Sequence, residues 1–173
     1  MDNIILIGMP GCGKSTIGVI LAKKLMYSFL DSDLVIQQRA GKRLYRILEE
    51  DGPEAFAELE NAVNASLDVR RTVVATGGSA VYWEESMNHL KSIGTIVYIM
   101  TDYEELKRRI GDFATRGIYL PEGMSFEDLY RERTPLYDRY ADITVQSGNG
   151  PTWETVERIA TAIDYYREEE KKD

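Results

Sequence analysis

The sequence predicts an α/β protein with three layers, in which helices cover both faces of a five-stranded parallel sheet. Two observations lead to this fold class. Short apolar runs rich in β-branched residues alternate with segments of helical period, the pattern of strands joined by crossover helices. A glycine-rich segment also connects the first apolar run directly to the first helical segment, which is the context of a phosphate-binding loop.

The first strand and helix are expected on either side of this loop. Residues 3–7 form an apolar run of the buried-strand type, and apolar residues at helical spacing predict a helix over 14–26. A short strand at 28–31 follows and ends on an acidic residue. Asp31 and Asp33 then mark the start of a helix that closes at Ala40-Gly41.

Helices predominate in the next part of the chain, 33–63, which we expect to be a small substrate-binding subdomain inserted between strands. One helical piece is predicted over 44–50. Pro53, a residue typical of a first helical turn, predicts the start of another helix over 54–69. Apolar residues recur at helical spacing along this second helix.

The second half of the chain continues the alternation. Apolar runs predict strands at 72–76, 95–100 and 142–146. Two acidic capping patterns mark helix starts, Asp102 with Glu105 and Ser125 with Asp128, and a closing helix is expected over 153–167. The whole chain, 1–173, is therefore expected to be one domain.

Residues 111–124 differ from the rest of this half. They contain three glycines and a proline and show no helical period. A segment of this kind between two helices is expected to be a lid loop over an active site.

The glycine-rich segment is a complete P-loop motif. Residues 8–16, GMPGCGKST, match G-x-x-x-x-G-K-S/T from Gly8 through Gly13 and Lys14 to Ser15. Glycines let successive backbone N–H groups point at phosphates, and the next helix adds its dipole. Lys14 is expected to reach the β- and γ-phosphates of a nucleotide, and the Ser15 hydroxyl to bind the Mg²⁺ that bridges them. The predicted ATP contacts of this segment are Gly11, Cys12, Gly13, Lys14, Ser15 and Thr16.

The composition restricts the partners. A net charge of −8 and a pI near 4.8 argue against a nucleic acid or an anionic membrane surface, so an anionic substrate must meet local arginines. No apolar stretch approaches the roughly 20 residues that span a bilayer. Cys12 is the single cysteine, and the sequence opens directly on a strand without a signal peptide. We therefore expect a cytoplasmic protein, and as a separate expectation we take it to be a monomer.

Two carboxylates are candidates for chemistry. The strand at 72–76 carries no acid, so Asp31 and Asp33 are the nearest carboxylates at the carboxyl end of a predicted strand. One of them is expected to help hold Mg²⁺ through water, which leaves the other for the substrate. Alternatively, either aspartate could only cap the helix that begins there.

These motifs together resemble the shikimate kinase family, and the likeness spans nearly the whole chain. It includes the P-loop, Asp31-Ser-Asp33, Gly77-Gly78, an arginine of the expected lid at Arg116, and the segment 133–137, RTPLY, which is similar to the family's R-x-P-L-Y. The resemblance implies transfer of the γ-phosphoryl group of ATP to the 3-hydroxyl of shikimate, a step of chorismate and aromatic amino acid biosynthesis.

The resemblance also implies roles for residues on the acceptor side. Asp31 would belong to the Mg²⁺ shell, Asp33 would bind the substrate hydroxyl and act as the base, and Arg133 would bind the substrate carboxylate. The other substrate contacts implied are Gly77, Gly78 and Ser79.

On the nucleotide side, Arg116 would close over the transferring phosphates and would be catalytic together with Lys14. Arg109 would lie against the adenine, and the loop that ends at Pro151 would border it.

Three positions depart from the family pattern. Ala57 replaces the arginine of F-R-x-x-E in the segment 56–60, FAELE, Ser79 replaces the third glycine of G-G-G, and Gly117 replaces the proline after the lid arginine. Only Arg133 then remains to hold a substrate carboxylate, unless another arginine reaches in. The candidates for this are Arg43 and Arg46, which we expect to be solvated.

The function therefore has alternatives. The acceptor could be another hydroxylated acid or a polyol, and the chain could also be a non-catalytic ATP-binding module. A binding module needs Lys14 but has no use for Asp33, Arg116 and Arg133 together, so the acceptor machinery favours a kinase.

Overall fold

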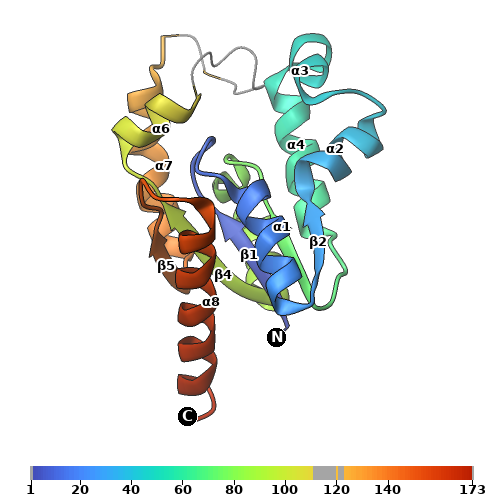
Figure 1. Cartoon of the computed structure of the whole chain (residues 1–173). Helices are drawn as coiled ribbons and strands as arrows, with labels where there is room; N and C mark the ends of the chain where they lie inside the picture. Colours follow the sequence, from blue (N-terminus) through green and yellow to red (C-terminus); the bar gives the residue numbers. More distant parts are fainter. Residues whose placement is uncertain (1, 111–119, 121–122, 173) are drawn as a thin grey trace.

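The computed structural model describes residues 2–110, 120 and 123–172, with a parallel sheet between two layers of helices (Figure 1). The strands are β1 (Asn3–Ile7), β2 (Ser28–Asp31), β3 (Thr72–Ala75), β4 (Gly94–Met100) and β5 (Ile143–Gln146). Their order in the sheet is β2-β3-β1-β4-β5, and all neighbours are parallel. The predicted three-layer α/β/α fold with a five-stranded parallel sheet is confirmed.

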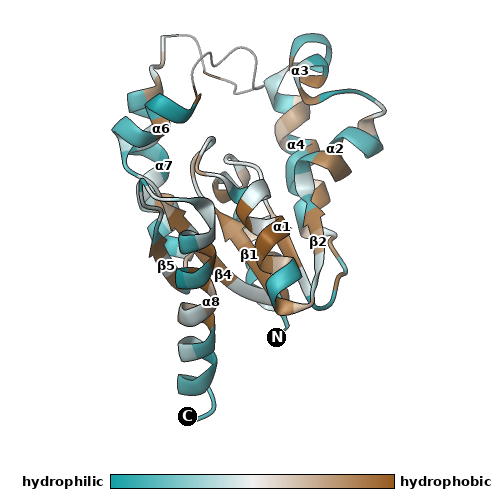
Figure 2. Ribbon diagram, viewed as in Figure 1, coloured by the Kyte–Doolittle hydropathy of each residue, from teal (hydrophilic) through white to brown (hydrophobic). Residues whose placement is uncertain are grey.

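The three inner strands of the sheet, β3, β1 and β4, are buried on both faces. All five residues of β1 are buried, and Ile5 lies in register with Val74 of β3 and Ile96 of β4. Figure 2 shows these apolar strands in brown between helices of mixed colour, of which α6 and α8 are mainly hydrophilic. Strands covered on both sides need continuous apolar runs, which explains why the sequence of β1 does not alternate.

The helices are distributed over both faces. They are α1 (Lys14–Leu25), α2 (Ser32–Ala40), α3 (Leu44–Arg46), α4 (Gly52–Ala65), α5 (Glu84–Ile93), α6 (Tyr103–Ile110), α7 (Phe126–Tyr140) and α8 (Thr152–Glu169), with a π-helix η1 (Ile47–Asp51) and a 3₁₀ turn η2 (Ala80–Tyr82). Helices α1 and α8 pack together on one face, and α5 and α7 contact β4 from the other. The helices α2–α4 stand beyond the end of β2, opposite α6 and α7 (Figure 1).

The single helix expected over 44–50 is divided in the structure. Helix α3 ends after one turn, and the chain widens into η1. Lys42 Nζ lies 3.0 Å from Glu50 Oε2 and 2.8 Å from Asp51 Oδ1, so ion pairs tie η1 to the preceding loop. The spacing of residues in this short segment does not distinguish a π-helical turn from an α-helical one. The sequence therefore predicted an ordinary α-helix.

The helix expected over 54–69 also has different ends. Helix α4 begins at Gly52 and stops at Ala65, where the Ser66 hydroxyl donates to the Val63 carbonyl at 3.1 Å. Leu67 is apolar at a helical spacing, but it packs into the main core under the sheet after the helix has ended. The apolar pattern therefore continued beyond the helix itself.

The helices α2–α4 have a small apolar core of their own. Ile36, Ile47 and Val63 form a buried cluster separate from the core around the sheet. The lid expected at 111–124 lies mostly outside the described residues.

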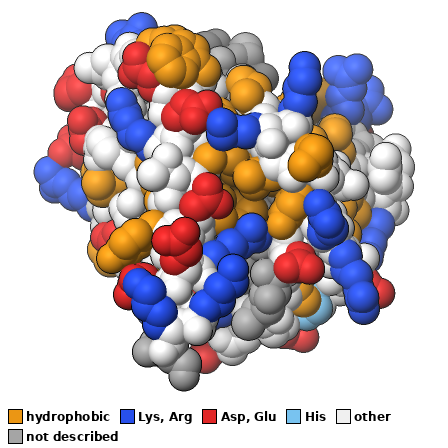
Figure 3. Space-filling model, turned by 60° about the horizontal axis from the view of Figure 1, so that its bottom comes forward, with side chains coloured by type: hydrophobic (Ala, Val, Ile, Leu, Met, Phe, Trp, Pro, Cys, Tyr) orange, Lys and Arg blue, Asp and Glu red, His pale blue; other side chains and the backbone are white. Residues whose placement is uncertain are grey.

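None of the helices in the described part of the chain is both long and apolar enough to cross a membrane. On the face shown in Figure 3, acidic and basic side chains are interspersed, so the excess of negative charge does not gather there into one patch.

Candidate active site

The P-loop follows β1, the central strand of the sheet. Its backbone is left-handed at Gly11, with φ of +83°, and at Gly13, with φ of +99°. A Cβ at position 11 would also lie 2.5 Å from Ile110 Cγ1, so glycine is needed there for space as well as for conformation. Cys12 is buried in the main core, and the loop therefore presents its backbone rather than the thiol.

Lys14 holds a positive charge at the loop. Its Nζ donates to the Gly8 carbonyl at 2.7 Å and to the Met9 carbonyl at 3.1 Å. The residue is only 9% exposed, so its charge is poorly screened by water. A buried ammonium with neutral carbonyl partners favours an anion at this position.

Ser15, Asp31 and Asp33 meet where α1 and α2 begin. Ser15 Oγ donates to Asp31 Oδ2 at 2.6 Å, and the Asp33 backbone N–H donates to Asp31 Oδ1 at 3.0 Å. Asp31 therefore caps α2, as the alternative interpretation held, and still has its second oxygen beside Ser15. A hydroxyl and a carboxylate side by side suit Mg²⁺, which takes oxygen ligands and keeps several waters. The described residues contain no group of three or more His, Cys, Asp or Glu placed to hold a metal ion.

A cavity of about 760 Å³ opens beside the P-loop. It is lined by the loop and by side chains of α2, α4, α7 and the segment after β3. Its polar lining includes Lys14, Ser15, Asp33, Glu60, Ser79 and Arg133, and its apolar lining includes Pro10, Leu44, Phe56 and Ala57. Gly77 and Gly78 also line it. The structure thus brings the P-loop together with all the residues expected to contact the acceptor.

Two carboxyl groups of this cavity have raised pKa values. Burial and the neighbouring Asp31 carboxylate raise the pKa of Asp33 to about 6, while Lys14 acts in the opposite direction. Burial raises the pKa of Glu60 to about 7. A side chain at position 77 would overlap the Glu60 carboxyl and place a Cβ 3.1 Å from Asp33 Oδ1, so Gly77 lets the backbone pass between the two acids.

Arg133 is the only arginine that lines the cavity in the part of the chain that the structure describes. It is 7% exposed, and its Nε donates to the Tyr82 hydroxyl at 3.1 Å. The guanidinium carbon lies 5.1 Å from the centre of the Tyr82 ring, and the Tyr82 hydroxyl donates to Glu132. These contacts hold the guanidinium in one orientation, so it can pair with an anion in the cavity at a small further cost in entropy.

A second cavity, of about 420 Å³, lies on the other side of the P-loop. Arg109 crosses it: one guanidinium nitrogen lies 3.3 Å from the Cys12 carbonyl oxygen, and another lies 3.1 Å from the Gly148 carbonyl oxygen. The loop up to Pro151 borders this cavity. Gly11, Gly13 and Thr16 line both cavities, so a nucleotide in the second cavity can present its phosphates to the first.

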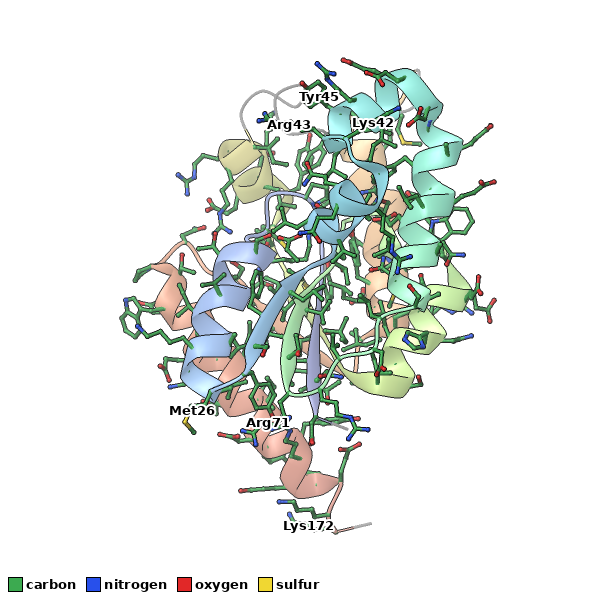
Figure 4. The ribbon with its side chains drawn as sticks, turned by 90° about the vertical axis from the view of Figure 1, so that its right-hand side faces the viewer. Met26, Lys42, Arg43, Tyr45, Arg71 and Lys172 are labelled. Atoms are coloured by element: carbon green, nitrogen blue, oxygen red, sulfur yellow. The ribbon has the colours of Figure 1, made fainter. Side chains whose placement is uncertain are left out.

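Arg43 and Arg46, the two arginines considered as further partners of a substrate carboxylate, do not line the large cavity. Both are exposed, as expected. Figure 4 shows Arg43 beside Lys42 and Tyr45 at the outer end of the molecule. Arg116 and the neighbouring Gly117 lie outside the described residues.

The sequence interpretation gave no role to Glu60 or Tyr82. A signal for Glu60 was present, because residues 56, 60 and 63 lie on one helical face and the first and last of them are apolar. A charged residue on such a face is costly unless it is used. Tyr82 had no comparable signal, since its contact with Arg133 joins parts of the chain 51 residues apart.

Comparison with known proteins identifies the family. The family model described as shikimate kinase matches residues 10–164, from the P-loop into α8. The chain is 38% identical over 148 residues to the shikimate kinase of Vibrio vulnificus (strain YJ016). The aligned segment covers 84% of this chain and 86% of that protein. The chain belongs to the shikimate kinase family. It is therefore an ATP-dependent small-molecule kinase.

Solved structures of the family have the same fold. The shikimate kinase from Acinetobacter baumannii in complex with shikimate superposes with a TM-score of 0.86 at 32% identity, over 94% of this chain and 93% of that one. The shikimate kinase from Aquifex aeolicus superposes with a TM-score of 0.80 at 33% identity, over 94% and 96%. In both comparisons the match therefore covers nearly all of each chain.

Proposed function

We propose that this protein transfers the γ-phosphoryl group of ATP to the 3-hydroxyl of shikimate. Family membership supports this function, and so does the bound shikimate named for the related structure from Acinetobacter baumannii. The observation that carries the proposal is the large cavity, where the P-loop, Asp33 and Arg133 face the same space. A small molecule bound in this cavity would therefore lie next to the P-loop, where the phosphates of ATP would bind. It would also lie next to Asp33, which could accept a proton, and next to Arg133, which could pair with a carboxylate.

The roles proposed for the nucleotide side follow from the two cavities. Adenine occupies the second cavity between Arg109 and the loop at Pro151, and the phosphates cross the P-loop toward Lys14. Ser15 and Asp31 would hold Mg²⁺, which supplies positive charge to the β- and γ-phosphate oxygens when it is bound. Arg116 of the proposed lid, 111–124, closes over the phosphates.

On the acceptor side, Asp33 accepts the proton of the substrate 3-hydroxyl. The hydroxyl oxygen forms a bond to the γ-phosphorus, and the bond between that phosphorus and the β–γ bridging oxygen breaks, so that ADP leaves. Arg133 pairs with the substrate carboxylate, and the segment at Gly77, Gly78 and Ser79 contacts the ring. The subdomain 33–63 forms the outer wall of this site.

A substrate panel tests the proposal. ADP release would be measured with MgATP and either shikimate, the methyl ester of shikimate, a sugar acid or a neutral polyol, and the product would be identified by ³¹P NMR. Phosphorylated shikimate as the main product, with a much slower reaction of the uncharged ester, would support the proposal. Preference for a polyol, or ADP release that no acceptor stimulates, would contradict it. The monomeric state, the cytoplasmic location and the lack of nucleic-acid or membrane partners stay predictions.

The proposal predicts a gain of function at Ala57. This residue lines the cavity one helical turn before Glu60, so an arginine there would extend toward the site of the carboxylate. One additional charge-assisted hydrogen bond contributes about 1.5–3 kcal/mol, roughly ten- to a hundredfold in affinity. We expect Ala57→Arg to lower the KM for shikimate by up to this factor and to leave the KM for ATP unchanged.

Steady-state kinetics of Ala57→Arg would be compared with those of Ala62→Arg, which adds the same charge at an exposed position of α4. An equal change in both variants would show that overall charge is responsible. No change in either variant would indicate that the wild-type cavity already supplies the missing donor.

A further inference from the structure

Glu132 is an acidic residue of the large cavity, next in sequence to the arginine that is proposed to hold the substrate carboxylate. Its side chain is exposed, and it lines the cavity together with Tyr82 and Arg133. A carboxylate beside a guanidinium can pair with it and compete with a substrate carboxylate for the same nitrogens. In this cavity, however, a tyrosine hydroxyl stands between the two charged groups.

The Tyr82 hydroxyl connects Arg133 and Glu132 through two hydrogen bonds. It accepts from Arg133 Nε at 3.1 Å and donates to the Glu132 carboxylate. Burial and the hydrogen bond to Glu132 both raise the pKa of this hydroxyl, so it keeps its proton in neutral solution and remains a donor. Glu132 is therefore bonded to a neutral partner instead of to the arginine.

The guanidinium of Arg133 lies between the Tyr82 ring and the backbone at Gly78. Its central carbon is 5.1 Å from the centre of the ring, and a Cβ at position 78 would lie 3.1 Å from Arg133 Nη1. The Gly78 carbonyl in turn accepts a hydrogen bond from the Tyr137 hydroxyl at 2.6 Å. Because Nε is used by Tyr82, an anion would be bound through the terminal nitrogens of a guanidinium that is already in place.

The cavity offers a substrate carboxylate few alternatives to Arg133. Within the described residues its lining has two cations, Lys14 at the P-loop and Arg133 on α7. The wall formed by α4 presents only the methyl group of Ala57 at the position where a second arginine would stand in the family pattern. An ion pair between Glu132 and Arg133 would therefore remove the main partner of the carboxylate.

We propose that Tyr82 is a positioning residue, which holds the Arg133 guanidinium and engages Glu132 so that the arginine stays available to the substrate carboxylate. This inference rests on the proposed function, because it requires an acceptor that carries a carboxylate. It assigns part of the affinity for the acceptor to a tyrosine that acts through the arginine. Loss of the hydroxyl would leave space into which the exposed Glu132 side chain can move and pair with Nε directly.

The first test replaces Tyr82 by phenylalanine, which keeps the ring against the guanidinium and removes only the hydroxyl. The kcat and the KM values for ATP, shikimate and the methyl ester of shikimate would be measured. We expect the KM for shikimate to rise about three- to tenfold, because Arg133 loses a hydrogen bond and gains a competing carboxylate. The KM for ATP, the KM for the uncharged ester and kcat should stay close to those of wild type.

The second test adds Glu132→Gln, since an amide cannot form an ion pair with the arginine. The double variant Tyr82→Phe/Glu132→Gln should recover most of the lost affinity for shikimate. Glu132→Gln alone should not raise the KM, because the native carboxylate is already bonded to Tyr82. Tyr165→Phe is the matched control for loss of a tyrosine hydroxyl, because Tyr165 is 67% exposed on α8, and it should match wild type.

An unchanged KM for shikimate in Tyr82→Phe would overturn the inference. An equal rise for the ester would also overturn it, because Tyr82 would then be a wall of the cavity and not a support for Arg133. Full loss of affinity in the double variant would remove the role given to Glu132, and a Tyr82→Phe protein that does not fold would assign the hydroxyl to stability instead.

Failure of the proposed function has a different signature. If wild type phosphorylates another acid and not shikimate, the proposed acceptor is wrong, and the same comparison of Tyr82→Phe with wild type is made with that acid. Preference of wild type for a neutral polyol would contradict both the proposed function and the role of Tyr82.

Discussion

Replacement of Lys14 by methionine is expected to reduce phosphoryl transfer by roughly a thousandfold or more. The ammonium lies at the P-loop, where we propose that the phosphates bind, is only 9% exposed and has carbonyl oxygens as its partners. Negative charge moves toward the β–γ bridging oxygen as the bond to the γ-phosphorus breaks, and a positioned cation stabilises that change. A thioether of similar length supplies neither charge nor a hydrogen-bond donor.

The loss should be read from kcat/KM in a coupled assay of ADP release, with Lys23→Met as the matched control. Lys23 lies on the same helix but is exposed, so its replacement should leave the rate unchanged. Methionine at position 14 also leaves the Gly8 and Met9 carbonyls without their donor, and a thermal unfolding curve would show whether the loop still folds. A folded Lys14→Met protein with undiminished turnover would contradict the assignment of the P-loop as the ATP site.

The sequence predicted the fold and the position of the P-loop well because both depend on local patterns. Four of the five strands were marked by an apolar run, and the P-loop was marked by consecutive residues whose glycines are required by backbone geometry at Gly11 and Gly13. Asp31 and Asp33 could be placed beside the loop because all strands of a parallel sheet have their carboxyl ends at the same end of the sheet. None of these inferences needed knowledge of side-chain packing.

The rest of the site depends on contacts between distant segments. Glu60 faces the cavity because α4 packs beside the segment after β3, and its raised pKa arises from this burial. The Tyr82 hydroxyl meets Arg133 only after η2 and α7 come together. The wide turn at η1 was missed for a similar reason, since it is accompanied by ion pairs from Lys42 rather than by an apolar period.

Asp33→Asn is expected to lower kcat by about 10²- to 10⁴-fold, the contribution of a positioned general base. Asp33 lines the large cavity with Lys14 and Ser15, which places its carboxylate on the acceptor side of the phosphates. An amide of the same shape can still accept a hydrogen bond from the substrate hydroxyl through its carbonyl oxygen, but it cannot take up the proton. Binding of shikimate and ATP should therefore change much less than kcat.

A comparison of Asp33→Asn with Asp68→Asn separates base catalysis from a general effect of charge. Asp68 is an exposed aspartate between α4 and β3, near the amino-terminal end of that strand and thus at the end of the sheet opposite to the P-loop, so its replacement should leave kcat as in wild type. The Asp33 backbone N–H, not its side chain, bonds to Asp31, so the cap of α2 survives in Asp33→Asn and the variant should fold. A wild-type kcat in folded Asp33→Asn would show that proton transfer to this residue does not limit the reaction. Loss of shikimate binding at unchanged kcat would make Asp33 a binding residue and leave the role of the base to another group of the cavity.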